Sequence, residues 1–185
     1  MNTPVKYCAS ILSVDLNCCL LEYLRERVLS REAFLLKPGE VCHHLYFVES
    51  GLLRCFYHKG DKEISSRFIQ EGEVGWSPES FLLQHKGTEY IQALERSHVI
   101  TLSYEDIQSI CWFFPIFDMV RRRITEASLI AHEQRMQAMW MQRSDERLAW
   151  FIRQFPGLLD KVTGRHIASY LGISEVMLSR RRRDI

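Results

Sequence analysis

The chain contains 185 residues, of which 46% are hydrophobic and 25% are charged, and its formal net charge is +1. This length can bury a proper core and fits one large domain or a domain with a small second module. No stretch approaches the roughly 18 apolar residues of a membrane span, and the start Met1-Asn2-Thr3-Pro4 lacks a basic region followed by an apolar run. The sequence therefore predicts a cytoplasmic protein without a membrane partner.

The overall charge conceals an asymmetry along the chain. Residues 143–185 hold 9 Lys and Arg against 5 Asp and Glu, whereas residues 1–142 hold 15 against 18. An excess of positive charge in one segment is typical of a surface that meets nucleic-acid phosphates.

The six cysteines lie within the first 111 residues and show no C-x-x-C spacing. In a cytosolic protein we expect them to be reduced core thiols. The Cys18-Cys19 pair and the Cys42-His43-His44 triple lack a second, properly spaced half, so we expect no metal or iron–sulfur site. The sequence also has no nucleophile elbow, HExxH motif or Walker loop, and we expect no enzymatic activity.

The first predicted elements are one helix and a series of strands. The helix follows Asp15, because apolar residues recur at helical spacing at Leu16, Cys19, Leu20, Tyr23 and Leu24. Short apolar strands are predicted at 33–36, 45–48, 52–57, 63–69, 89–94 and 98–103. The Lys37-Pro38-Gly39-Glu40 segment has Pro and Gly where a type II turn requires them. Strands separated by such turns predict an antiparallel barrel or roll.

Helical character returns at 104–107, and Pro115 then opens a long helical stretch. Steps of three and four residues define a heptad seam at Phe117, Val120, Ile124, Ala127, Ala131, Gln134, Ala138 and Met141. This seam favours a dimerisation helix, in which the alanines permit close approach and Gln134 fixes the register. The alternative is an amphipathic helix packed against its own roll.

A further helix is predicted at 144–155, beginning with Ser144 as its cap and ending before Pro156-Gly157. Its apolar residues would form the floor of the last module. Residues 156–162 then connect to that module.

The final segment has the pattern of a helix-turn-helix. We expect Thr163 to cap a first helix, Gly172 to end it in the left-handed conformation, and Ser174 to cap a second helix. Ile173 would fill the corner, and Leu178 with Val176 or Met177 would hold the second helix down. The outward faces would then carry Glu175, Ser179, Arg180 and Arg183.

Such a second helix fits a major groove, where Arg suits guanine edges and phosphates. Because helix-turn-helix proteins read two half-sites, this pattern also favours dimerisation over the alternative for the long helix. The competing interpretation of the segment is a plain helical hairpin whose terminal arginines form a solvated face.

The order of these elements resembles the Crp/Fnr family of bacterial transcription regulators, in the compact form common among Bacteroidetes. The phrases that carry the resemblance are residues 45–52, 72–75, 91–95, 167–174 and 178–180. The implied fold is α+β: an antiparallel β-roll of the double-stranded β-helix or jelly-roll type at 1–115, a dimerisation helix at 116–142 and a DNA-binding helix-turn-helix domain at 143–185. The family implies a homodimer that binds double-stranded DNA at a palindromic promoter site and recruits or blocks RNA polymerase.

The resemblance also indicates a candidate ligand pocket in the roll. Gly72-Glu73 matches the half of the family's cassette that takes the ribose of cAMP, but Gly87-Thr88 stands where the phosphate-binding Arg-Ser would be, followed by Glu89. Without a guanidinium, an anionic phosphate loses its strongest partner, although Lys86 could substitute for it.

On the helix side of the pocket, His132-Glu133 replaces the Thr-Ser pair that holds the base. The sequence therefore predicts that Gly72, Glu73, Thr88, His132 and Glu133 do not bind cAMP and that no cofactor is held. We expect Glu73 to be a turn carboxylate bonded to local backbone N–H groups, beside a pocket that is empty or serves an unknown small-molecule effector.

In the family, base readers lie at the first, second and sixth positions after the capping serine, which here are Glu175, Val176 and Arg180. Only Arg180 matches the chemistry of the cAMP receptor, so a different operator is expected. The expected backbone contacts, which position the protein without specifying sequence, are Thr163, Ser174, Ser179, Arg181 and Arg183. The alternative function is a small-molecule sensor or protein-interaction module whose terminal hairpin does not bind DNA.

Overall fold

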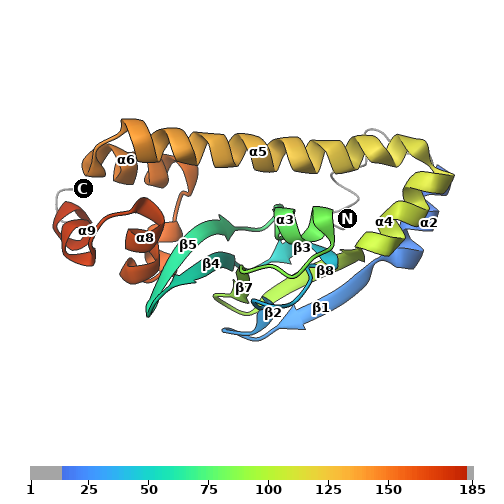
Figure 1. The fold of residues 1–185 in the computed structure, drawn as a ribbon, viewed down its shortest axis with the longest axis horizontal. Helices are drawn as coiled ribbons and strands as arrows, with labels where there is room; N and C mark the ends of the chain where they lie inside the picture. The colour runs from blue at the N-terminus through green and yellow to red at the C-terminus, as the bar shows by residue number, and fades with distance from the viewer. Residues whose placement is uncertain (1–13, 183–185) are drawn as a thin grey trace. The chain divides into compact units, whose positions relative to one another are not determined.

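The structure is a computed structural model that describes residues 14–182 (Figure 1). The predicted phosphate contact Arg183 lies outside the described residues. The chain forms two compact units: the first combines the chain up to Cys55 with Phe68–Thr125, and the second combines Phe56–Arg67 with the chain from Glu126 onward.

Two four-stranded sheets build the predicted β-roll. The first sheet has the order β1 (Arg25–Leu29), β8 (Ser97–Ser103), β3 (His44–Ser50) and β6 (Val74–Gly75). The second has the order β2 (Phe34–Leu36), β7 (Tyr90–Ala93), β4 (Leu53–Lys59) and β5 (Lys62–Ile69). In the first sheet β8 pairs antiparallel with both neighbours, so that Val99 lies opposite Arg27 on one side and Val48 on the other.

Apolar side chains of the first unit make one continuous core. Val48, Leu53, Ile91, Val99 and Ile100 are completely buried. Such a core is the main source of stability, since apolar burial contributes about 25 cal/mol per Å². Helices α2 (Val14–Tyr23), α3 (Pro78–Leu83) and α4 (Tyr104–Phe113) and the 3-10 turn η1 (Pro115–Phe117) complete this unit.

The strands, helices and turn predicted for the first part of the chain are confirmed. The six predicted strands and both helices are present, and Glu40 N donates to Lys37 O at 3.1 Å across a turn with Gly39 at φ 84°. Three further elements were not predicted. Strand β1 is largely exposed and begins Arg25-Glu26-Arg27, β6 has two residues, and α3 is a six-residue helix opened by Pro78.

The long helix α5 spans Asp118–Met141. The predicted seam is wrong for its first part, because Phe117, Val120 and Ile124 are 3%, 2% and 5% exposed and belong to the core of the first unit. Apolar residues at helical spacing fit a helix packed on its own domain as well as they fit a dimer seam. Here these three residues are buried in the core of their own unit. Ala138 is also buried.

The exposed face of α5 overlaps the second part of the predicted seam, with which it shares Ala127, Gln134 and Met141. Along this face, steps of three or four residues join Met119, Arg123, Ala127, Ile130, Gln134, Gln137 and Met141, which are all exposed. We call these seven residues the α5 stripe. Its positions repeat as the contact face of a paired helix would.

The second unit contains α6 (Ser144–Gln154), α7 (Leu158–Lys161), α8 (Gly164–Leu171) and α9 (Glu175–Arg182). Helix α6 is the predicted floor, because Leu148 and Phe151 are buried and the Phe151 and Tyr170 rings lie 5.6 Å apart. Its cap differs by one residue from the prediction: Arg143 is the N-cap, and Arg143 N donates to Glu146 Oε2 at 2.7 Å. Within residues 14–182, none of the helices has the length and apolar character needed to cross a bilayer.

Candidate nucleic-acid interface

The corner between α8 and α9 has the backbone of a helix-turn-helix. Gly172 ends α8 at φ 63°, and Ile173 N donates back to Ala168 O at 3.0 Å. Ser174 Oγ then accepts from Met177 N at 3.2 Å and caps α9. The predicted roles of Gly172 and Ser174 are therefore confirmed, and both rest on local chemistry.

Thr163 is the N-cap residue of α8, as predicted, but it does not cap the helix with its side chain. The side chain of Thr163 makes no capping hydrogen bond, and instead its carbonyl oxygen accepts from His166 N at 3.1 Å and Ile167 N at 3.2 Å. Thr163 itself is exposed at the start of α8.

Helix α9 is anchored by a single side chain. Leu178 is 2% exposed, whereas Val176 and Met177 are 62% and 42% exposed, so neither of the latter two holds the helix down as predicted. An ideal Cβ on Gly164 would lie 3.8 Å from Leu178 Cδ2, which places this anchor against the first turn of α8. The other seven residues of α9 are exposed, an arrangement that leaves nearly the whole helix surface available for a groove.

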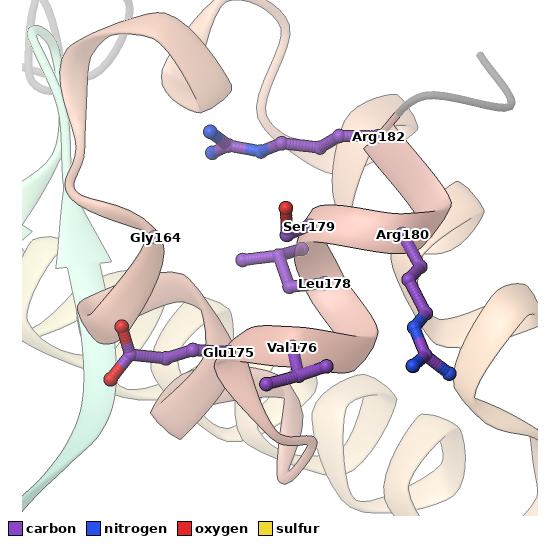
Figure 2. A pocket seen from close by; sticks show the side chains of 7 residues that line it. All are labelled: Gly164, Glu175, Val176, Leu178, Ser179, Arg180 and Arg182. Atoms are coloured by element: carbon purple, nitrogen blue, oxygen red, sulfur yellow. The ribbon is translucent and has the colours of Figure 1, made fainter.

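The predicted base readers are all exposed on α9 (Figure 2). Glu175 and Arg180 point to opposite sides, with Val176 between them. These residues border an open hollow of about 770 Å³, which is also lined by Gly164, Leu178, Ser179 and Arg182. A carboxylate, an aliphatic group and a guanidinium in this order offer three different contacts to base edges.

The arginines at the end of α9 have different environments. Arg182 Nη2 donates to Leu159 O at 3.0 Å and so ties the last turn of α9 to α7. Arg180 and Arg181 are exposed. The sequence pattern could not distinguish Arg182 from the two arginines before it, because the hydrogen bond of Arg182 depends on the position of α7.

Helix α8 is also held by a segment distant in sequence. Ser65, at the β4–β5 hairpin, is completely buried. Its backbone N donates to Ser169 Oγ at 3.1 Å, and its hydroxyl donates to His166 O at 3.0 Å. The contact between Ser65 and Ser169 was not predicted, because the pattern of a strand does not indicate a partner 104 residues away in the sequence.

Arg135 of α5 completes the contact with the hairpin. Its Nη2 atom donates to Ser65 O at 3.2 Å and to Tyr170 O at 3.1 Å, and its guanidinium lies 4.6 Å from the centre of the Tyr170 ring. Burial lowers the pKa of Arg135 from its ordinary value. A further contact between the hairpin and α8 joins His166 Nε2 to Glu63 Oε2 at 3.6 Å. The helix that supports α9 is thus bonded to both the hairpin and α5.

The end of α8 is fixed by α5 and α6. Arg147 Nη1 donates to Leu171 O at 2.8 Å, which satisfies a carbonyl at the helix terminus. An ideal Cβ on the next residue, Gly172, would lie 2.6 Å from the terminal methyl Cε of Met139 and 3.3 Å from Arg147 Nη1. A side chain at this position would therefore require the end of Met139 to move.

The candidate ligand residues of the first unit form ordinary turns. Glu73 Oε2 accepts from Gln70 N at 2.7 Å, as predicted for a turn carboxylate, and desolvation raises the pKa of this carboxyl group although the residue is exposed overall. Gly72 has φ 86° and donates its N–H to Val48 O at 2.9 Å.

The position of the missing phosphate-binding arginine is closely packed. Gly87 N donates to Glu40 O at 3.0 Å, and a Cβ on Gly87 would lie 3.1 Å from Ser80 Cβ. Lys86 and Thr88 on either side are exposed. A long side chain at 87 would have to displace Ser80.

The remaining two candidate residues belong to the second unit. His132 and Glu133 are exposed on α5, and Gln137 Nε2 donates to Glu133 Oε1 at 3.4 Å. None of the hollows described for this unit is lined by either residue.

Residues 26–111 match the family model of the cyclic nucleotide-binding domain. FixK2 from Bradyrhizobium japonicum is 16% identical with a TM-score of 0.75, covering 87% of this chain and 83% of that one. The c-di-GMP responsive global regulator CLP from Xanthomonas campestris is 15% identical with a TM-score of 0.73, covering 93% and 91%. A protein from Eubacterium rectale assigned to the crp/fnr family of transcriptional regulators is 15% identical with a TM-score of 0.73, covering 97% and 87%.

A comparison with curated protein sequences finds no match. The predicted α+β fold class and the predicted resemblance are confirmed by the domain match and by the shared fold. Residues 26–111 therefore form a domain of the cyclic nucleotide-binding type, and the chain has the fold of Crp/Fnr-type transcription regulators.

Proposed function

We propose that the chain is a sequence-specific DNA-binding transcription regulator that acts as a homodimer on a palindromic promoter site. The observation that carries this proposal is α9, which is anchored by Leu178 and leaves its other seven residues exposed behind the Ser174 cap. A helix held in this way fits a major groove, whose width admits one α-helix. The same proposal makes the chain a regulator rather than an enzyme.

Three residues of α9 are proposed to read bases. Arg180 suits the two acceptors of guanine, Glu175 suits the amino group of cytosine, and Val176 suits the methyl group of thymine. The proposed contacts to the DNA backbone come from exposed residues that offer hydroxyl or guanidinium donors, together with Arg183: Thr163, Ser174, Ser179 and Arg181.

The α5 stripe is proposed to pair with the stripe of a second chain. Three of its residues, Met119, Ile130 and Met141, are large apolar side chains that are 37%, 57% and 82% exposed. A two-fold pair would present two copies of α9, and helix-turn-helix dimers place these about 34–36 Å apart, one turn of DNA. The pairing therefore matches the need for a palindromic site.

The proposed effector is not cAMP. Glu73 is bonded to Gln70 N, and Gly87 is packed against Ser80 where a guanidinium would be needed. A cyclic phosphate would then be bound without its charge-assisted partner. An effector of another chemistry, and recruitment or blocking of RNA polymerase, complete the proposal.

Selection from a pool of random DNA duplexes tests this function. We expect enrichment of one motif with two inverted half-sites whose centres lie about one helical turn apart. If the full chain enriches no motif and binds no duplex, the proposal is wrong, and the alternative of a sensor or protein-interaction module takes its place.

A further inference from the structure

Four large apolar side chains are exposed together where α4 ends and α5 begins. Trp112 is 83% exposed, Phe113 69%, Ile116 43% and Met119 37%. We call these four residues the α4–α5 patch. All of them belong to the first unit and lie close together in sequence around the bend between α4 and α5, and exposed apolar patches mark interaction sites.

The direction of the patch follows from the residues that anchor this bend. Ile110, Phe117 and Val120 are 0%, 3% and 2% exposed and belong to the core. Because these positions alternate with those of the patch along the chain, the bend has an inner and an outer side. The outer side has no function in the fold of the unit.

We propose that the α4–α5 patch packs against the same patch of a second copy of the chain. This inference rests on the proposed homodimer and extends its interface beyond α5. Met119 belongs to both surfaces, so the patch continues the α5 stripe at its first turn. In a parallel two-fold pair, residues at the start of one α5 meet their own counterparts at the start of the other.

The area that a stable dimer must bury favours a second copy of the chain as the partner of the α4–α5 patch. A standard interface buries about 800 Å² on each partner. The α5 stripe alone is a weak candidate for that area, because four of its seven residues are small or polar: Arg123, Ala127, Gln134 and Gln137. A completely buried aromatic side chain covers roughly 150–250 Å², so the exposed parts of Trp112 and Phe113 would add substantially to the area that the stripe supplies.

The chemistry of the patch also suits a second copy. The four residues carry no charge. Residues close to a two-fold axis face their own counterparts, so a charge at such a position would meet a like charge at an unfavourable cost. An uncharged patch avoids this cost.

Sedimentation equilibrium of the full chain tests the proposal with a double variant, Trp112→Ala with Phe113→Ala. We expect the Kd of dimerisation to rise by at least about tenfold, because aromatic residues dominate the energetics of interfaces. The matched control is Leu82→Ala with Leu83→Ala on α3, whose side chains are 47% and 65% exposed outside the patch. We expect this control to dimerise as the parent does.

A third variant separates the two proposals. Ile130→Glu places a charge in the α5 stripe and should give monomers. If it does so while the aromatic double variant dimerises as tightly as the parent, the patch is not in the interface, although the homodimer stands. If Ile130→Glu leaves the dimer intact, the pairing of α5 in the proposed function is wrong.

A measurement on the parent protein avoids any effect of the substitutions on folding. In protein labelled with 5-fluorotryptophan, the Trp112 resonance can be assigned from its loss in Trp112→Phe. We expect this resonance to lose its H2O/D2O isotope shift in the dimer. A Trp112 that remains accessible to solvent in the dimer would contradict the proposal and leave the patch open to a partner of another kind.

Discussion

In the proposed function, sequence readout depends most on Arg180. It is exposed on α9, on the opposite side from Glu175. We expect Arg180→Ala to weaken binding to the selected operator by about 1–3 kcal/mol and to relax specificity at one base pair, because a bidentate contact to guanine is lost. Fluorescence anisotropy with the operator and its single-base variants measures both effects.

Arg182 provides the matched control for this substitution. It has the same side chain on the same helix, but it is bonded to Leu159 O. Arg182→Ala should lower stability slightly and leave the preferred sequence unchanged. If Arg180→Ala kept the affinity and sequence preference of the parent, Arg180 would not be a base reader.

Gly172 tests the rigidity of the corner. At φ 63°, a side chain costs about 1–2 kcal/mol for the left-handed backbone alone, and a Cβ would also meet Met139 Cε at 2.6 Å. Gly60 is a control with φ 58° and no atom within 4 Å of its ideal Cβ. In urea unfolding, Gly172→Ala should therefore destabilise the protein more than Gly60→Ala; equal effects would mean that Met139 moves aside at no cost.

Glu73 and Gly87 lead to a prediction about ligands. Because the Glu73 carboxylate is bonded to Gln70 N and Gly87 leaves no guanidinium for a phosphate, millimolar cAMP should leave the melting temperature unchanged. Differential scanning fluorimetry measures this, with a cAMP-binding regulator as the positive control. A rise in melting temperature with cAMP concentration would show that the roll binds the nucleotide by other groups.

At the scale of elements, the hairpin that carries Ser65 is hydrogen-bonded to α8 within the second unit. Ser65→Ala removes the hydrogen bonds to His166 O and Ser169 Oγ in a buried position, which should cost about 1–3 kcal/mol of unfolding free energy. Ser109→Ala is the control, since Ser109 bonds Glu105 O on an exposed face of α4. Amide hydrogen exchange should rise in α8 for Ser65→Ala only; unchanged exchange in α8 would mean that the hairpin does not hold this helix.

The elements also show what the sequence could and could not predict. Gly172 and Ser174 were identified correctly because a left-handed residue and an N-cap act on their own neighbours. The contact between Ser65 and α8 could not be predicted, since it joins two locally unremarkable segments. Thr163 occupies the predicted N-cap position, but the predicted side-chain bond is absent; the bonds there are accepted by its backbone carbonyl, which any residue has.

The first part of the heptad seam failed for a different reason. Phe117, Val120 and Ile124 satisfy the pattern of a dimer helix and the pattern of a helix packed on its own domain. Periodicity identifies the apolar face of a helix but not the surface that covers it. Only the burial of these residues reveals the α5 stripe as the face that remains.

At the scale of the whole molecule, the two units have separate roles in the proposal. The first unit supplies a domain of the cyclic nucleotide-binding type and the α4–α5 patch, and the second supplies the α5 stripe after its first turns and the helix-turn-helix. A regulator with this division should bind DNA as two chains on one duplex. The positive charge of its C-terminal segment should make that binding depend on salt.

The most direct test is a salt titration of binding to the selected duplex, with the stoichiometry measured in the same samples. We expect two chains per duplex and a logarithm of the binding constant that falls linearly with the logarithm of salt concentration, with a slope of about −0.9 for each phosphate neutralised. Binding that does not depend on salt, or one chain bound per symmetric duplex, would contradict the assignment of this chain as a dimeric DNA-binding regulator.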